Sequence, residues 1–317
     1  MSAFSTGIES QATRLPEPQH GLVVINPVAG NVRVRQVQNF LSQLASSRRW
    51  CLEIHVTTGH NEVSALVRQK VGQGVDFVIV IGGDGTLSEV ATGLVYANVP
   101  LAILPLGTGN VVAQELGLPL DVEAASRVIS GSHCLSSLDV MQVDQRVFVS
   151  HISLGLYALV AQETSVLDKR RFGRGAYLWN VIRKMRERRA WRFDLWVDDQ
   201  PYLVKASMVL LANAGAVGLS SLRWGHNIRL DDGQIDLCVV KGRTLAEYAQ
   251  SLWHMSRGDY ERDPNIWRLP VRRRVSIRTR GPLPVRADGE IIGHHSVEIN
   301  ILPKAIQIVR PLDGSSP

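Results

Sequence analysis

The chain has 317 residues, of which 45% are hydrophobic and 20% are charged. This composition supplies enough apolar material for two domains of ordinary size, and it excludes a disordered, collagen-like or low-complexity protein. The formal net charge of +6 favours acidic partners such as nucleic acid, anionic lipid or a phosphorylated substrate, without choosing among them.

The first 20 residues are polar and lack the basic start and apolar core of a signal peptide, so we expect a disordered leader. The longest weakly polar run, residues 207–219, is well short of the roughly 20 residues that a membrane-spanning helix needs. Cys51, Cys134 and Cys238 are widely spaced and have no His at ligand spacing, which argues against a disulfide framework or a zinc site. These features predict a cytoplasmic protein.

Strands and helices alternate through the first part of the chain. Short β-branched runs that end at Gly, Pro or Thr are followed by segments with apolar residues at helical spacing. The alternation predicts a doubly wound, parallel α/β domain over residues 21–136, with ligands at the carboxyl ends of its strands. The expected strands are residues 21–26, 51–57, 75–81 and 101–104, and the expected helices are residues 32–44, 61–71 and 87–96.

After about residue 137, strand-like runs follow one another with few helices between them. This change predicts a second domain over residues 137–304, an antiparallel β-sandwich. The segment 305–317 is expected to form a C-terminal strand and tail that could join either domain. The expected strand-rich runs are residues 136–151, 191–211, 234–240 and 274–309, interrupted by helices at residues 174–189 and 245–257.

Glycine-rich turns follow three of the expected parallel strands. GGDGT, at residues 82–86, lies between a strand and a helix, where free N–H groups and the positive helix end favour phosphate binding. Alone it could be a plain turn in which Asp84 or Thr86 caps the helix. NPVAG, at residues 26–30, and PLGTGN, at residues 105–110, follow two other expected strands and so are expected at the same edge of the sheet. The recurrence favours a phosphate site, although PLGTGN can also be read as an ordinary turn.

These three motifs together resemble the catalytic domain of the diacylglycerol kinase family, which includes sphingosine and ceramide kinases. The resemblance covers nearly the whole chain after the leader and is closest to the soluble bacterial lipid kinases, in which a nucleotide-binding α/β domain precedes a β-sandwich. Ala29 stands where many relatives carry Ser, which removes one hydroxyl contact. The resemblance implies that ATP binds at Asn26, Pro27, Gly30, Thr57, Gly82, Gly83, Asp84, Gly85, Thr86, Leu87, Ser88 and Thr108.

Two acids are the candidate catalytic residues. Nucleotide phosphates reach a kinase together with Mg²⁺, so Asp84 could hold this ion beside the glycines. In some relatives, the resemblance implies, the equivalent acid instead activates the lipid hydroxyl. Glu290 ends the ADGE run at residues 287–290, where Asp288-Gly289 is typical of a hairpin turn. By itself Glu290 could be a solvated loop carboxylate, but the resemblance implies that it is the general base.

A second acidic run, RLDDGQID at residues 229–236, precedes another expected strand. Read locally, it is a turn. The resemblance implies a structural Mg²⁺ bound by Asp232 with backbone oxygens of Arg229 and Gln234, and oxygen ligands suit this hard cation.

Residues 169–192 hold ten basic residues against one acid, interleaved with apolar residues at helical spacing. Such a helix can lie on an anionic bilayer, or its apolar stripe can pack on the β domain. The absence of any nucleic-acid motif argues against a nucleic-acid partner. We therefore expect peripheral association with the inner face of the membrane, and the resemblance and the frequency of symmetric dimers favour a homodimer.

The resulting prediction is an ATP- and Mg²⁺-dependent kinase that phosphorylates the hydroxyl of a membrane lipid, most simply diacylglycerol to phosphatidic acid. Ceramide and long-chain bases remain open as acceptors, because acyl-chain sites are apolar and degenerate. An NAD kinase also resembles the chain through GGDGT, but PLGTGN and a DGE near the C-terminus favour the lipid kinase. A catalytically inactive nucleotide-binding regulator is the third alternative. The presence of every acid expected for catalysis argues against it.

Overall fold

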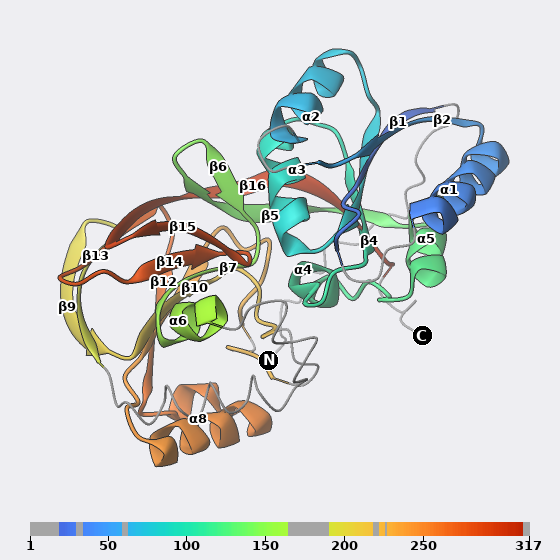
Figure 1. Cartoon of the computed structure of the whole chain (residues 1–317). Helices are drawn as coiled ribbons and strands as arrows, with labels where there is room; N and C mark the ends of the chain where they lie inside the picture. Colours follow the sequence, from blue (N-terminus) through green and yellow to red (C-terminus); the bar gives the residue numbers. More distant parts are fainter. Residues whose placement is uncertain are drawn as a thin grey trace, which may run out of the picture.

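The computed structural model describes residues 19–29, 34–58, 63–163, 190–217, 222–225 and 227–312. Residues 1–18 of the expected leader, Gly30, the expected helix at residues 174–189 and most of the basic run lie outside these residues. Gln19 and His20, which were expected to belong to the leader, instead begin the first strand, because both pair with the neighbouring strand. Figure 1 shows a helix-rich N-terminal half beside a strand-rich C-terminal half.

The N-terminal half is the expected parallel α/β domain. Its strands pair in the order β2-β1-β3-β4, all parallel. The strands are β1 (Gln19–Ile25), β2 (Trp50–Val56), β3 (Phe77–Gly82) and β4 (Leu101–Pro105). The helices are α1 (Val34–Arg48), α2 (Val63–Gly72), α3 (Asp84–Leu94), α4 (Val111–Glu115) and α5 (Val122–Ser130).

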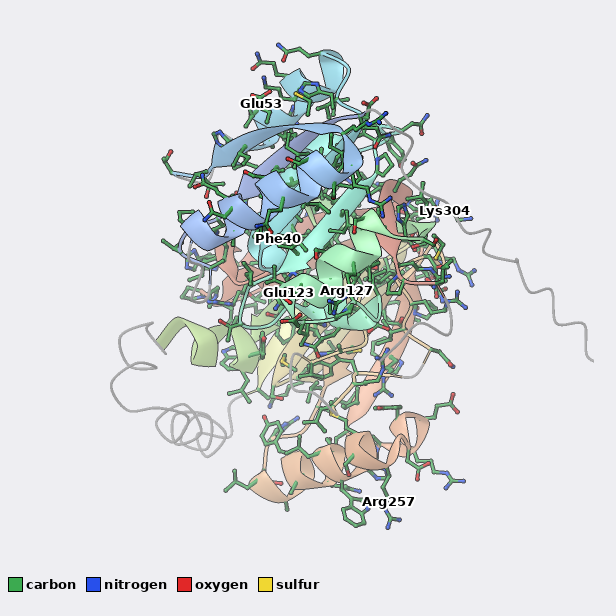
Figure 2. The ribbon with its side chains drawn as sticks, turned by 90° about the vertical axis from the view of Figure 1, so that its right-hand side faces the viewer. Phe40, Glu53, Glu123, Arg127, Arg257 and Lys304 are labelled. Carbon is green, nitrogen blue, oxygen red and sulfur yellow. The ribbon has the colours of Figure 1, made fainter. Side chains whose placement is uncertain are left out.

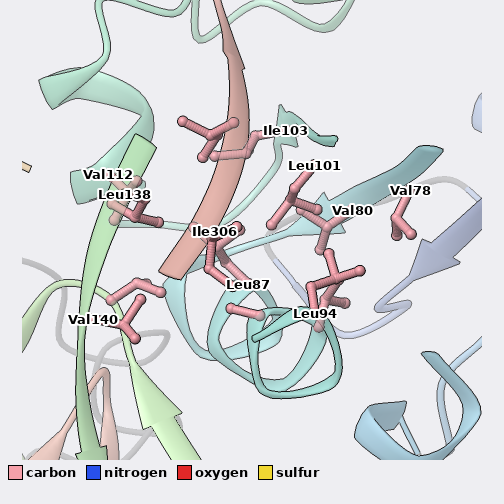
Figure 3. Close-up of a cluster of buried hydrophobic side chains, with 14 of the residues drawn as sticks. Val78, Val80, Leu87, Leu94, Leu101, Ile103, Val112, Leu138, Val140 and Ile306 are labelled. Carbon is pink, nitrogen blue, oxygen red and sulfur yellow. The ribbon is translucent and has the colours of Figure 1, made fainter. Parts of the chain in front are cut away.

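Helices cover both faces of this sheet, which explains why its strands are apolar at nearly every position. In β1, Leu22 and Val24 face one hydrophobic cluster, which includes residues of α2 and α3. Val23 and Ile25 face another, which includes residues of α1 and α5. Figure 3 shows the first cluster, in which Leu87 and Leu94 of α3 meet strand residues and Ile306 from the far end of the chain.

The C-terminal half is an antiparallel β-sandwich. One sheet has six strands in the order β12-β11-β10-β7-β14-β15. It packs against β16, β13 and β8 of the other sheet through one shared hydrophobic cluster. The strands are β5 (Cys134–Val143), β6 (Arg146–Phe148), β7 (His151–Gly155), β8 (Trp191–Val197), β9 (Gln200–Ala206), β10 (Met208–Ala212), β11 (Ile235–Val240), β12 (Ile266–Val271), β13 (Arg274–Thr279), β14 (Pro284–Ala287), β15 (Glu290–His294) and β16 (Ser296–Arg310).

Strand β16 joins the two halves, so the final run belongs to both. It pairs antiparallel with β13 at its start and parallel to β4 near its end, where Ile308 lies opposite Leu101. A register shift between Leu302 and Ile306, with Lys304 at a positive φ of 49°, marks the place where the strand passes from one half to the other. Among the described residues, one ten-stranded sheet therefore runs through both halves.

The described part of the C-terminal half contains helices α6 and α8. Helix α6 (Leu156–Glu163) directly follows β7 and was not expected from the sequence. Helix α8 (Leu245–Arg257) has the expected bounds and is followed by a short 3-10 turn, η1 (Tyr260–Arg262). Helix α3 begins at Asp84, three residues before the expected start, so Asp84, Gly85 and Thr86 belong to its first turn.

Candidate active site

A cleft of about 250 Å³ lies between the glycine-rich turns of the α/β domain and the start of β15. Five of the predicted nucleotide-binding residues line it, and the candidate base Glu290 lines it from the other half of the protein. Val28 and Ala29 of NPVAG and Gly107 of PLGTGN also line it, as does Glu89, which the sequence did not single out. The predicted residues in the lining are Asn26, Gly83, Gly85, Thr86 and Thr108.

Asn26 ties the first glycine-rich turn to the start of α3. Its Nδ2 donates to Thr86 Oγ1 at 2.8 Å, and its Oδ1 accepts from the backbone N–H of Val28 at 3.1 Å. The second contact is the local turn that Asn favours. Both side-chain groups of Asn26 therefore fix the shape of the cleft wall.

The other predicted nucleotide contacts lie behind or beside this wall. Leu87 and Ser88 are 2% exposed, so their side chains are not available to a ligand in the cleft. Thr57 follows β2 and donates its backbone N–H to Ile25 at 2.8 Å. Pro27, Gly82 and Asp84 adjoin the lining residues in the chain without belonging to the lining themselves.

The PLGTGN turn packs directly against the GGDGT turn. The N–H groups of Leu106 and Gly107 donate to Gly82 O at 3.0 and 3.2 Å. Asn110, whose φ is +46°, closes the turn because its Oδ1 accepts from Gly107 N at 2.9 Å and its Nδ2 donates to Gly107 O at 2.8 Å. The two glycine-rich turns thus form one backbone platform.

We predict that Gly107→Ala disrupts this platform. A Cβ on Gly107 would lie 2.5 Å from Gly83 Cα and 2.8 Å from Asn110 Oδ1, so the turns must separate to accept it. We expect ATP affinity, measured by calorimetry, to fall about tenfold or more, which corresponds to about 1.4 kcal/mol. Gly281→Ala is the matched control, because a Cβ there meets nothing within 4 Å. Equal affinity in both variants would contradict the close packing of the turns.

Asp84 connects the start of α3 to the start of α4. Its Oδ2 accepts from Val111 N at 3.0 Å and its Oδ1 from Val112 N at 3.2 Å, so the carboxylate caps α4. Burial, the largest cause, and the charge of Asp288 raise the pKa of Asp84 to about 6, although the two amide hydrogen bonds lower it. This capping contact is one that the sequence did not predict for Asp84.

The raised pKa predicts a pH dependence of stability that Asp84→Asn removes. Between the usual Asp pKa of 3.8 and about 6, the folded state keeps a proton that the unfolded chain has lost, so stability falls as the pH rises through this window. Because Asn does not titrate, the stability advantage of the natural chain over the variant should shrink by up to about 3 kcal/mol across the window. Urea unfolding from pH 4 to pH 7 measures the difference, and a constant difference would contradict the prediction.

Asp288 connects α3 to the strands of the C-terminal half. Its carboxylate accepts from Ser88 Oγ at 2.5 Å, and from the N–H groups of Val149, Ser150 and His151 at 2.7, 3.1 and 2.9 Å. The hydroxyl of Ser150 donates to it as well. The hairpin turn expected at Asp288-Gly289 is present, with φ of +41° and +97°. The sequence identified the turn but not the role of its carboxylate.

Glu290 begins β15 and faces the GGDGT turn. A Cβ placed on Gly85 would lie 3.8 Å from Glu290 Oε1. Its Oε2 accepts from Arg146 Nη2 at 2.8 Å, and the two side chains are 26% and 41% exposed. Arg146 also lies over the ring of Phe148, 5.2 Å from its centroid. A base that stays accessible to a substrate and is held by a cation can act beside a bound phosphate.

Arg229, Asp232 and Gln234 lie together on the loop before β11. Asp232 is exposed and accepts from Gln234 N and Gln234 Nε2, each at 3.2 Å, while Arg229 Nε donates to Asp231 at 3.1 Å. In the part of the chain that the structure describes, no three His, Cys, Asp or Glu side chains gather as a metal site. The carboxylate of Asp232 is the kind of oxygen ligand that a hard cation takes.

The same loop is anchored by buried Asp139 on β5. Asp139 accepts from Gly233 N at 2.7 Å and from Lys304 N at 2.6 Å, and it is fully buried. Burial, the largest cause, raises the pKa of Asp139, and the charges of Asp232 and Asp231 add to this. Asp139 thus fixes the loop against the bend in β16, a contact that the sequence did not indicate.

The described ranges contain no helix that is both long and apolar enough to cross a bilayer.

Comparisons with known proteins match both halves of the chain. The family model described as diacylglycerol kinase catalytic domain matches residues 20–143, and the one described as YegS C-terminal NAD kinase beta sandwich-like domain matches residues 150–310. A protein of Staphylococcus saprophyticus named diacylglycerol kinase is 28% identical over 80% of this chain and 86% of its own. An uncharacterized protein of Synechocystis is 26% identical over 95% of this chain and 72% of its own.

Among solved structures, a crystal structure titled as a diacylglycerol kinase from Bacillus anthracis superposes with a TM-score of 0.71. It is 23% identical and the superposition covers 92% of this chain and 97% of the other, so it supports the fold. Since the two family models together cover both halves of the chain, the protein belongs to the diacylglycerol kinase catalytic-domain family and is a lipid kinase.

Proposed function

We propose that the protein transfers the γ-phosphate of ATP to the hydroxyl of a membrane lipid, most simply diacylglycerol to give phosphatidic acid, in a Mg²⁺-dependent reaction. The observation that carries the proposal is the position of Glu290. This carboxylate lies across the cleft from the GGDGT platform, close to Gly85. A phosphate on the platform and an alcohol beside Glu290 would therefore meet within one cleft.

The platform supplies the electrostatics for the phosphates. Helix α3 starts at Asp84, and its positive N-terminal end opens toward the glycines of the turn. The close packing of Gly83 on Gly107 lets backbone reach a ligand without interference from side chains. In phosphoryl transfer such positioning supplies most of the catalysis.

Glu290 would take the proton of the acceptor hydroxyl. An alcohol cannot carry its proton into the new phosphate ester bond, so the O–H bond breaks as the bond to phosphorus forms, and ADP leaves. Arg146 donates to Oε2, and Oε1 lies on the side of Gly85. Asp84 would act by holding the start of α4, and thereby the PLGTGN turn, in place.

For the metal, we propose two sources. Mg²⁺ that arrives with ATP is part of the substrate and neutralises phosphate charge. A structural Mg²⁺ would be held by Asp232 with backbone oxygens of Arg229 and Gln234, on the loop that Asp139 anchors. Chelation tests the two ions separately. Loss of the nucleotide-bound ion should abolish lipid phosphorylation alone, whereas loss of the structural ion should also lower the melting temperature of the protein.

The test of acceptor identity is a panel assay with ATP labelled in its γ-phosphate. Diacylglycerol, ceramide and sphingosine in mixed micelles are compared with soluble NAD, because the description of the C-terminal family model leaves NAD as a rival acceptor. We expect label in diacylglycerol. Label in NAD would move the assignment to an NAD kinase, and ATP binding without transfer to any acceptor would favour a nucleotide-binding regulator.

A further inference from the structure

The hairpin formed by β5 and β6 places an arginine beside the candidate base. Its turn consists of Asp144, which has a positive φ of 51°, and Gln145. Arg146 is the first residue of β6, directly after this turn. Its Nη2 donates to Glu290 Oε2 at 2.8 Å, so the hairpin reaches the first residue of β15 from a distant part of the chain.

The packing of β6 fixes the backbone beside Arg146. Strand β6 lies against α3 (Figure 1), and Val147 is buried in the hydrophobic cluster that includes residues of this helix. The N–H of Val147 donates to Thr92 Oγ1 at 3.0 Å, and this hydroxyl donates to Ser88 O at 2.8 Å. The hairpin is therefore tied to the helix whose first turn belongs to the GGDGT platform.

The side chain of Arg146 has a second contact, with a buried ring. Alternate residues of a strand share a face, so Arg146 and Phe148 lie on the same face of β6. The guanidinium lies 5.2 Å from the centroid of the Phe148 ring, and Phe148 is buried in the hydrophobic cluster of the sandwich. A cation over an aromatic face is attracted to it. The ring and the carboxylate of Glu290 together fix the position of the guanidinium.

The ion pair between Arg146 and Glu290 contributes little to the stability of the fold. Their side chains are 41% and 26% exposed. Glu53, near the top of Figure 2, forms a similar partly exposed pair with Lys70 at 2.7 Å. Water screens such pairs, so the loss of one changes stability only slightly. The pair of Arg146 differs from that of Lys70 because its carboxylate lines the active-site cleft.

Arg146 itself stands outside the cleft. The described residues that line the cleft include two acids, Glu89 and Glu290, and no Arg or Lys. Arg146 contacts Oε2 of Glu290, whereas Oε1 is the oxygen that would lie 3.8 Å from a Cβ on Gly85. One carboxylate oxygen thus faces the arginine and the other faces the phosphate platform. This placement favours an effect of Arg146 on the base over direct contact with a bound ligand.

We propose that Arg146 is the positioning residue of the base. By holding Oε2, it keeps Oε1 of Glu290 directed at the acceptor hydroxyl beside the platform. The proton of that hydroxyl passes to Oε1 as its oxygen bonds to phosphorus and ADP leaves, while Arg146 keeps its own protons. A glutamate side chain rotates about several bonds, and a contact that fixes it before the substrate arrives removes this freedom from the reaction. The inference deepens the proposed function and rests on Glu290 as the base.

A double-mutant cycle of Arg146→Met and Glu290→Gln tests this role. Met keeps an unbranched stem over the ring of Phe148 but has no N–H donor. We expect Arg146→Met to lower kcat for phosphate transfer to diacylglycerol by about tenfold to a hundredfold, the cost of a misplaced catalytic group. In the Glu290→Gln background the same change should cause no further loss, because the base through which Arg146 acts is already absent. ATP labelled in its γ-phosphate makes the residual rates measurable.

Arg278→Met is the matched control. Arg278 on β13 lies 4.0 Å from Glu298 and 5.4 Å from the centroid of the Trp196 ring, so it reproduces both contacts outside the cleft. This variant should keep the natural kcat. Arg146→Lys, which keeps the charge and a donor on a flexible stem, should recover part of the lost kcat. All three arginine variants should match the natural chain in melting temperature and in ATP affinity measured by calorimetry.

Several results would overturn the inference. An unchanged kcat in Arg146→Met would mean that the contact has no effect on the base. Losses of kcat that multiply in the double variant would mean that Arg146 acts independently of Glu290, and a lower ATP affinity would make it a phosphate ligand. A lower melting temperature in Arg146→Met, or an equal loss of kcat in Arg278→Met, would reveal a general effect of structure or charge.

The cycle also separates this inference from the proposed function. Losses that multiply with diacylglycerol as the acceptor would remove the role of Arg146 and leave the lipid kinase in place. If label enters NAD and no lipid, the proposed function fails, and the same cycle measured with NAD decides the role of Arg146. A natural chain that transfers phosphate to no acceptor contradicts both.

Discussion

Glu290→Gln should lower kcat for lipid phosphorylation by about 10²–10⁴-fold, the contribution typical of a general base. The Gln side chain has nearly the same shape and can still accept a hydrogen bond from Arg146, but it cannot take the proton of the acceptor hydroxyl. Because the GGDGT platform is untouched, affinity for ATP should change little. Steady-state kinetics with labelled ATP and calorimetry with a non-hydrolysable analogue measure the two quantities.

The matched control is Glu298→Gln. Glu298 lies on β16 with its side chain 80% exposed, and it does not line the cleft. The same change of chemistry there should leave kcat at the natural value. A Glu290 variant with full activity would contradict the role of Glu290 as base and move attention to Asp84.

Asp288→Ala should be the most destabilising single change in the site. The substitution leaves the N–H groups of Val149, Ser150 and His151 without their acceptor, at a place where α3 meets the C-terminal half. Each buried donor left unsatisfied costs about 1–3 kcal/mol, so we expect a loss of at least about 3 kcal/mol in the free energy of unfolding.

Asp288→Asn provides the graded comparison. Its single amide oxygen can still accept from one or two of these N–H groups, so its stability should lie between those of the natural chain and the Ala variant. Urea unfolding at fixed pH measures all three. Equal stability of the Ala variant and the natural chain would show that Asp288 does not join the two halves.

Local patterns predicted the fold class because each pattern lies within one segment. Apolar runs that alternate with helical segments predicted the parallel sheet. In the structure, alternate residues of β1 enter the hydrophobic clusters on the two faces of that sheet, as a sheet covered by helices on both faces requires. The change to successive strands gave the antiparallel sandwich. The double pairing of β16 could not be predicted, because it depends on a bend at Lys304 and on partners about 200 residues earlier in the chain.

The site shows the same division between local and distant information. GGDGT and PLGTGN predicted a phosphate site, and the structure brings both turns to one cleft, at Gly83 and Thr108. Contacts across long sequence separations were not predicted: Arg146 bonds to Glu290 across 144 positions, and Ser88 to Asp288 across 200. A single sequence holds no pattern that pairs such residues, because the fold alone brings them together.

The most direct test of the central claim is transfer of labelled γ-phosphate from ATP to diacylglycerol in mixed micelles by the natural chain, beside Glu290→Gln and Glu298→Gln. We predict labelled phosphatidic acid from the natural chain and from the Glu298 variant, and almost none from the Glu290 variant. Labelled lipid formed equally by all three proteins would contradict the proposed base, and no labelled lipid from the natural chain would contradict diacylglycerol as the acceptor.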